Sequence, residues 1–262
     1  LIYLAELLYR ANPSEELLKK YNSLIQETAE FMYSFATYEE EHDRYVLKGA
    51  IPAQETLRAA ETVNPPFELS YWHFAMQVAQ TWRERTGMER VPEWDWLIEK
   101  LSPLAYNDEQ LYLAAETAVD TYKDIRFTSD HMAVLGAVGI LPMNQLIHAG
   151  YMKNTLHWIW DNWNWDKTWG WDYPMTAMNA ARMGEPEKAV SALLMDKRTN
   201  TYLVNGHNYQ DGRLRIYLPG NGGLLTTVAM MCAGWDGSEG NNPGFPKDGK
   251  WNVRWEGLQP LP

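Results

Sequence analysis

The loops between the predicted helices of this 262-residue chain alternate between long and short, and this alternation constrains the fold more than any other feature. Long loops, over residues 43–67, 123–129, 161–173 and 197–221, each precede a helix that a short polar loop joins to the next. The helices entered from long loops are small and apolar, as at 132–139 and 224–231. A helix that is apolar all round is usually buried, whereas a charged amphipathic one faces solvent. The pattern therefore predicts an all-α (α/α)6 toroid of alternating inner and outer helices.

The expected helices do not complete such a toroid. We predict helices over residues 1–11, 15–36, 68–86, 93–101, 108–122, 130–141, 144–160, 174–184, 186–196 and 222–234, with a short extended segment at 213–218. Five of them are inner helices, starting near residues 1, 68, 130, 174 and 222. Because a closed ring of twelve helices needs about 350 residues, we expect residues 1–262 to be a single domain, incomplete at its N-terminus. The missing part of the same protein should precede Leu1 and pack against this chain.

Composition excludes several classes of protein. Asp and Glu number 34 against 23 Lys and Arg, which gives a net charge of −11, and no basic run is present. Nucleic acid and an anionic membrane surface are therefore not expected as partners. No apolar stretch approaches the roughly 20 residues that span a bilayer. Cys232 is the single cysteine, so a disulfide framework or a cysteine-rich metal site is excluded. We expect neither a metal nor a cofactor.

The aromatic residues are mainly those with a polar group, with 13 Trp and 15 Tyr against 6 Phe. Many of the tryptophans fall between residues 158 and 171, interleaved with Asp and Asn. An indole can pack its flat face and still hydrogen bond through its N–H, which suits a saccharide with apolar C–H faces and polar hydroxyls. We predict that Trp169, Trp171 and Asp172, just before an inner helix, face such a ligand. Trp158 and Trp160 are expected to pack at a helix end.

Two carboxylates, Glu55 and Glu61, lie in a proline-containing loop before the helix at 68–86. A carboxyl group flanked by Pro, Ala and Leu can be desolvated, and its raised pKa then suits a general acid near neutral pH. The alternative is a glutamate that only forms hydrogen bonds within the loop. On the helix that follows, Trp72 is a further candidate for substrate binding.

Polar residues also gather before the last inner helix. Those that we predict to contact the substrate are His207, Asn208, Gln210 and Asn221. The glycines of 220–223 open a helix N-terminus, which can bind a phosphate or a sugar hydroxyl, but the spacing is not that of a dinucleotide site. The pair Asp130 and His131, at the start of another inner helix, is either a helix cap or part of the site.

These segments resemble the six-hairpin (α/α)6 glycosidase superfamily. The similarity is strongest to family 95, which contains inverting α-L-fucosidases and galactosidases, and to family 65 glycoside hydrolases and phosphorylases. Their general acids lie in Ser-Pro-Glu and Gly-Pro-Asp-Glu motifs, and Pro52-Ala-Gln-Glu55 is similar to both, with one extra residue. Segments 179–194, 219–225 and 255–262 are similar to a helical hairpin, a glycine-rich element and the closing segment of family 95.

The resemblance implies that this chain is the C-terminal portion of a catalytic domain, with Glu55 as the acid and a periplasmic or extracellular location. Pro219 stands where family 95 has an aspartate that supports the water-holding asparagine, and that asparagine would fall before Leu1. We therefore take Asp172 as the candidate base. The expected function is hydrolysis of an α-glycosidic bond with inversion. The alternatives are an inverting glycoside phosphorylase and a non-catalytic saccharide-binding protein.

Overall fold

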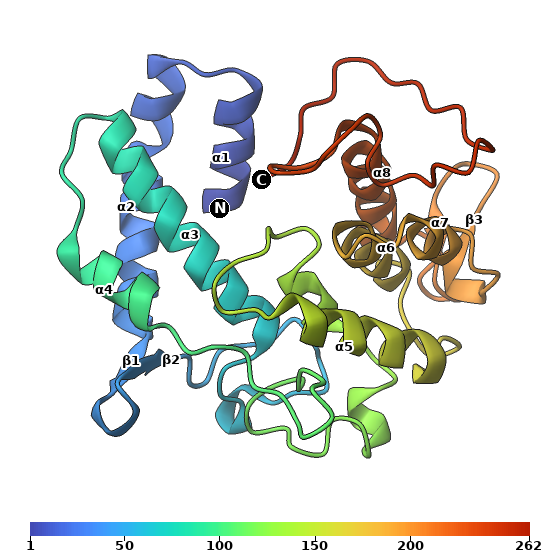
Figure 1. Cartoon of the computed structure of the whole chain (residues 1–262), viewed down its shortest axis with the longest axis horizontal. Helices are drawn as coiled ribbons and strands as arrows, with labels where there is room; N and C mark the ends of the chain where they lie inside the picture. The colour runs from blue at the N-terminus through green and yellow to red at the C-terminus, as the bar shows by residue number, and fades with distance from the viewer.

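The computed structural model describes residues 1–262, and eight α-helices dominate it (Figure 1). They are α1 (Ile2–Ala11), α2 (Glu15–Phe35), α3 (Pro66–Arg85), α4 (Pro92–Lys100), α5 (Ala149–Asn162), α6 (Asp172–Arg182), α7 (Pro186–Leu193) and α8 (Leu218–Ala233). Two short antiparallel hairpins complete the regular structure. One pairs β1 (Thr37–Glu39) with β2 (Arg44–Val46), and the other pairs β3 (Thr201–Tyr202) with β4 (Asn208–Tyr209).

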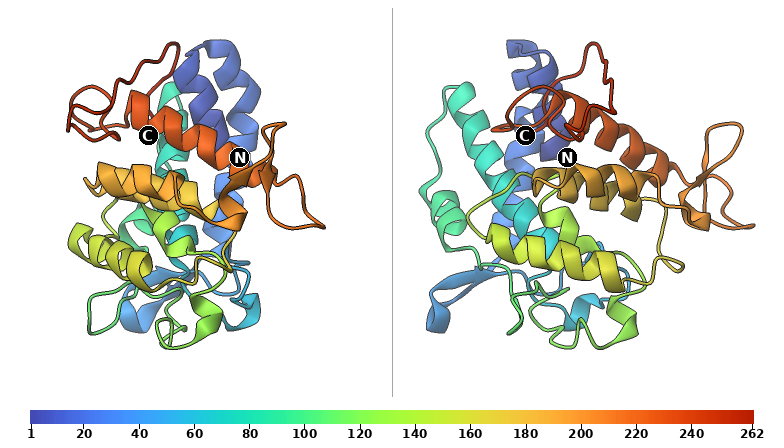
Figure 2. Two further views of the ribbon diagram at one scale, coloured as in Figure 1. Left: turned by 90° about the vertical axis from the view of Figure 1, so that its right-hand side faces the viewer. Right: turned by 45° about the vertical axis from the view of Figure 1, so that its right-hand side comes forward.

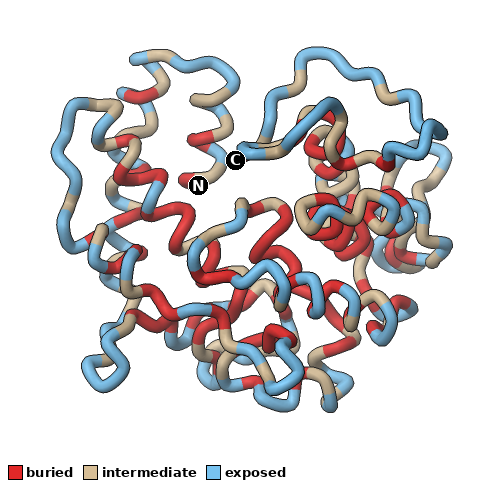
Figure 3. The backbone as a smooth tube through the Cα atoms, in the orientation of Figure 1, coloured by how far each residue is buried: buried red, intermediate tan, exposed pale blue.

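The helices form an inner row and an outer layer. In the inner row, α1 packs on α3, α3 on the 3₁₀ helix η4 (Ala133–Ala137), η4 on α6, and α6 on α8. Outside it, α2 packs on α1 and α3, α4 on α3, α5 on η4 and α6, and α7 on α6. Buried residues concentrate where α3, η4 and α6 meet (Figure 3). The predicted alternation of inner and outer elements is confirmed, in an arc of five inner elements.

The two ends of the inner row, α1 and α8, share at most a marginal contact. The C-terminal segment after α8 runs back toward α1 (Figures 1 and 2). Asp236 of this segment forms an ion pair with Arg10 of α1 at 2.6 Å, and Arg182 of α6 donates to the carbonyl oxygen of Pro262 at 2.6 Å. The segment therefore links the two ends of the arc. None of the helices is long and apolar enough to cross a lipid bilayer.

Local sequence explains several helix boundaries. The hydroxyl of Ser14 accepts the N–H of Leu17 at 3.2 Å and caps α2, as its position before two glutamates predicts. Between α6 and α7, Gly184 adopts a φ of 75°, which is favourable for glycine. Pro186 then begins α7, where its missing N–H costs no helical hydrogen bond.

Some predicted elements are wrong. Residues 108–122 form turns instead of a helix, because the side chain of Asn107 accepts the N–H groups of Glu109 and Leu111 and Gln110 adopts a φ of 61°. The helix expected at 130–141 is reduced to the five residues of η4, in a segment with glycines at 136 and 139. Residues 213–217 form neither helix nor strand, whereas Leu218, the last residue of the expected extended segment, begins α8. The two short hairpins were not predicted.

A buried carboxylate joins α1 to α3. Glu6 is 3% exposed and accepts hydrogen bonds from Trp82 Nε1 at 2.8 Å, Arg85 Nη1 at 2.6 Å and Arg10 Nε at 3.2 Å. Burial opposes its charge, but the bonds from Arg85, Trp82 and Arg10 outweigh burial and lower the pKa of Glu6.

We expect Glu6→Leu to lower the free energy of unfolding by about 3–5 kcal/mol, because the guanidinium of Arg85 and the indole N–H of Trp82 lose their acceptor. Urea denaturation followed by circular dichroism measures this change. Glu15→Leu is the control, since Glu15 is exposed and lies 3.7 Å from Lys19, a pair that contributes little. Equal losses in both variants would contradict this assignment.

Candidate active site

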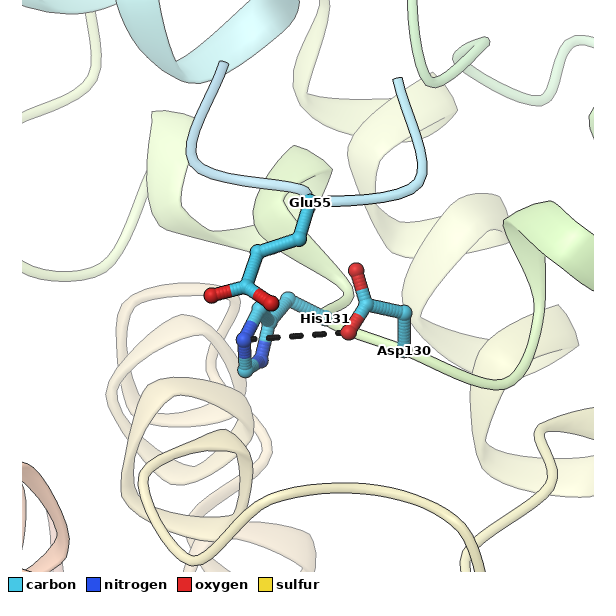
Figure 4. Close-up of side chains that lie close together, drawn as sticks. All are labelled: Glu55, Asp130 and His131. Atoms are coloured by element: carbon cyan, nitrogen blue, oxygen red, sulfur yellow. Dashed lines mark ion pairs between the residues drawn. The ribbon is translucent and has the colours of Figure 1, made fainter. Parts of the chain in front are cut away.

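Three side chains from two loops meet at one end of the inner row. Glu55 comes from the loop before α3, and Asp130 and His131 come from the segment before η4; the three point toward one another (Figure 4). One ligand atom of each lies within 4.8 Å of the other two, and His131 Nε2 is 3.8 Å from Asp130 Oδ1. Asp130 and His131 are buried, whereas Glu55 is exposed. Glu55 is therefore the member of this group that an incoming molecule can reach.

His131 Nδ1 has two polar neighbours. Trp171 Nε1 lies 2.6 Å from it, and an indole N–H can only donate. The same nitrogen also faces the carboxylate of Asp172, which is an acceptor, while Nε2 lies toward Asp130. Burial opposes the charged ring, but the carboxylates of Asp172, Asp130 and Glu55 outweigh burial and raise the pKa of His131.

Asp172 lies behind this group. It is fully buried at the start of α6, and its Oδ2 accepts the hydroxyl of Thr168 at 2.6 Å and the N–H of Trp169 at 2.8 Å. Both carboxylate oxygens are 3.3 Å from His131 Nδ1. Burial raises the pKa of Asp172. This position suits a group that supports His131, and it argues against Asp172 as the base that activates water.

Two tryptophans predicted from the sequence are part of the group. Trp169 Nε1 donates to Asp130 Oδ1 at 3.2 Å, and the rings of Trp169 and His131 are 5.6 Å apart. Trp171 binds His131 as described. Both tryptophans are half-buried, so their N–H groups are used within the protein while part of each ring stays accessible.

Tyr217 also faces this group, and the sequence analysis did not select it. Its ring is 5.6 Å from that of Trp169. Burial, together with the carboxylates of Asp172, Glu55 and Asp130, raises the pKa of Tyr217. Its place directly before α8 is the feature that could have identified it, because the other members also precede inner elements.

Gln210 and Asn208 are buried and support the site from within the protein. Gln210 Oε1 accepts the N–H of Gly170, between the two tryptophans, at 2.7 Å. Asn208 Nδ2 donates to the carbonyl oxygens of Thr199 at 3.0 Å and Thr201 at 3.3 Å. A Cβ on Gly170 would lie 1.9 Å from Asn208 Oδ1, so glycine is required at that position. Both side chains thus fix the backbone at Gly170, between Trp169 and Trp171.

The remaining predicted binding residues lie elsewhere. Asn221 accepts the N–H of Asn208 at 2.9 Å and donates to the carbonyl oxygen of Gly206 at 2.8 Å, so it fixes the β3–β4 hairpin. His207 belongs to that hairpin turn, where its N–H binds the side chain of Asn205.

Trp72 faces the outer layer. Its Nε1 donates to the carbonyl oxygen of Met32 at 2.9 Å, and its ring is 5.6 Å from that of Phe35, on α2. The structure therefore does not bring Trp72 to the group around Glu55. We expected Trp72 to face the substrate because it lies on an inner helix. The sequence does not show which face of that helix packs against α2.

An apolar cavity of about 410 Å³ adjoins the group. His131 and Trp171 form part of its wall, together with Ala53 of the Glu55 loop and apolar side chains such as Phe67 and Met175. The cavity lies among α3, η4, α6 and the first turns of α8. It provides a partly open, mainly apolar space beside an exposed carboxyl group.

The Glu55 loop does not contain the desolvated carboxyl group that we expected there. Glu55 and Glu61 are both exposed, and Glu61 pairs with Arg58 at 3.8 Å, away from His131. The desolvated carboxyl belongs to Glu68, in the first turn of α3, which is 9% exposed. Burial raises the pKa of Glu68 to about 7. Sequence reasoning missed this residue because an acid in a first helical turn is common.

Glu55, Asp130 and His131 are also the residues that could approach a metal ion. Asp130 already accepts the Trp169 indole at Oδ1 and the N–H of Thr56 at Oδ2. Each of these oxygens keeps a second lone pair, so the two hydrogen bonds orient Asp130 and still leave it able to accept a proton or a cation.

No family model and no curated protein sequence matches this chain. Among solved structures it is similar to a protein described as a "putative kojibiose phosphorylase from human microbiome", with a TM-score of 0.61 and 10% sequence identity. The match covers 88% of this chain and 36% of the other, so this chain spans about a third of that protein's length. The similarity shows that this chain shares its fold with part of that protein.

Proposed function

We propose that this protein cleaves α-glycosidic bonds and that Glu55 donates a proton to the departing oxygen. The support is geometric, since Glu55 is the exposed carboxyl in a group of buried polar residues beside a cavity. Trp169 and Trp171 offer partly accessible rings next to it, as saccharide binding requires. His131 lies next to Glu55 and can form a further hydrogen bond to a substrate oxygen.

We further propose that the attacking group is inorganic phosphate and not water. The support is that both buried carboxylates are largely closed to the solvent from which a water molecule would come. Asp172 is fully buried, and Asp130 is 8% exposed and is held by a hydrogen bond at each oxygen. A phosphate oxygen can attack the anomeric carbon from the face opposite the leaving group without a protein base. The carbon–oxygen bond to the leaving group breaks, Glu55 supplies its proton, and a glycosyl phosphate of inverted configuration forms.

Phosphate dependence tests this proposal. We expect the full-length protein to cleave kojibiose or another α-linked disaccharide at least about 100-fold faster with 10 mM phosphate than without it, because the nucleophile is then present. The product to detect by NMR is a glycosyl phosphate. Equal rates without phosphate, with free sugar as the product, would favour the hydrolase. Sugar binding without turnover under either condition would favour the non-catalytic saccharide-binding protein.

We also propose that a further segment of the same protein completes the ring between α1 and α8. The support is a set of exposed leucines on the two ends of the arc: Leu1 directly before α1, Leu4 and Leu8 on α1, and Leu225 on α8. Apolar rows of this kind normally pack against another helix. Such a segment would add walls to the cavity, and it could contribute residues to the site.

A further inference from the structure

The loop that carries Glu55 is held on both sides by buried carboxylates. We name residues 53–56 the acid loop. At its start, the N–H of Ala53 donates to Glu68 Oε1 at 2.6 Å, and at its end the N–H of Thr56 donates to Asp130 Oδ2 at 3.2 Å. Glu55 lies between the two anchors, with its own side chain free. The backbone on each side of the proposed proton donor is thus fixed to a different inner element, α3 or the segment before η4.

Burying a carboxylate in order to accept one backbone N–H costs free energy, because the ionised group loses its hydration. Glu68 is 9% exposed, and its carboxyl receives only the N–H groups of Ala53 and of its own residue. No charged side chain from α3, from the acid loop or from η4 contributes to its pKa. A charge-assisted hydrogen bond is about twice as strong as a neutral one. The arrangement therefore gives a firm hold on Ala53 at the expense of burying a charge without a counter-ion.

We propose that Glu68 is a positioning residue whose carboxylate, by holding Ala53, fixes Glu55 over His131. Glu68 does not touch the substrate, because Ala53 and not Glu68 forms the cavity wall. The proposal rests on the proposed role of Glu55. It differs from a purely structural role in that loss of the anchor releases the acid loop while α3 and the core stay folded.

Three variants test the anchor. Glu68→Ala removes the acceptor, Glu68→Gln keeps an acceptor oxygen without a charge, and Glu61→Gln is the control on the exposed side of the same loop. We expect Glu68→Ala to lower kcat by about 10–100-fold with KM changed less than about threefold, because proton donation is misaligned while substrate contacts remain. Glu68→Gln should recover most of this loss, and its kcat should depend less on pH between 6 and 8.

Amide hydrogen exchange of the acid loop gives a readout that needs no activity. In Glu68→Ala, protection of the Ala53 amide should fall at least about tenfold, while the amides of α3 keep theirs. In the wild type, protection of Ala53 relative to the intrinsic rate should decrease below pH 7, and in Glu68→Gln it should not. If Glu68→Ala fails to fold, the pH comparison of the wild type with Glu68→Gln still decides.

The outcomes separate this proposal from the proposed function. Unchanged protection of Ala53 in the variants would overturn the anchor whatever the turnover. Loss of protection with kcat unchanged would overturn the positioning role. If protection is lost in the variant but the wild-type protein turns over no glycoside, the proposed role of Glu55 is refuted. Glu68 then anchors the acid loop but positions no proton donor.

Discussion

Glu55→Gln is expected to lower the turnover of an unactivated α-glycoside by about 10²–10⁴-fold, the usual effect of losing a general acid. The amide keeps the size and the hydrogen-bonding capacity of the side chain but cannot supply a proton to the departing oxygen. Because Glu55 is exposed and accepts no hydrogen bond that anchors the loop, the fold and saccharide affinity should change little. Steady-state kinetics together with isothermal titration with the substrate measure both quantities.

The leaving group provides an internal control for this prediction. A nitrophenyl glycoside has an acidic leaving group that departs without protonation, so Glu55→Gln should lose much less activity on it. Glu61→Gln should behave as the wild type on both substrates, since Glu61 is exposed and pairs with Arg58. If Glu55→Gln matches the wild type on an unactivated glycoside, Glu55 is not the proton donor and the saccharide-binding alternative gains support.

The inner and outer rows of the fold were predictable because loop length and helix composition carry that information locally. The short turn at Gly184 and the long loop before α6 both appear in the sequence as the structure places them. For residues 108–122, loop length and composition did not distinguish a helix from a loop. Their alanines and leucines fit a helix, but the side chain of Asn107 and the φ of Gln110 favour turns.

The site was predictable only in part. Residues at or just before the starts of inner elements do converge, among them Glu55, Trp171 and Asp172. This position along the sequence does not distinguish a side chain that faces the cavity from one that supports it. Asp172 and Asn208 are buried supports, and that distinction depends on hydrogen bonds between loops far apart in the sequence. Trp72 shows the same limit on a helix, where only tertiary packing selects the face.

Glu68→Gln is expected to change the pH dependence of stability by about 3 kcal/mol, from 1.36 kcal/mol per pKa unit. Burial raises the pKa of Glu68 from its ordinary 4.5 to about 7 in the folded protein. Between these values the folded state binds the proton more readily than the unfolded state, so Glu68 makes stability fall as the pH rises from 4.5 to 7. Glutamine has no charge to bury and lacks this loss.

The measurement is the difference in free energy of unfolding between Glu68→Gln and the wild type, from urea denaturation at pH 4, 6, 7 and 8.5. The difference should shift in favour of the variant as the pH rises and level off above pH 7. Taking this difference cancels the contributions of the other titrating groups to the pH dependence of stability. Asp172 is one of them, because burial also raises its pKa. Parallel curves for the two proteins would show that Glu68 is not desolvated in the folded state. Burying the charge would then cost no free energy, and there would be no reason to infer that this carboxylate is kept for its hold on the acid loop.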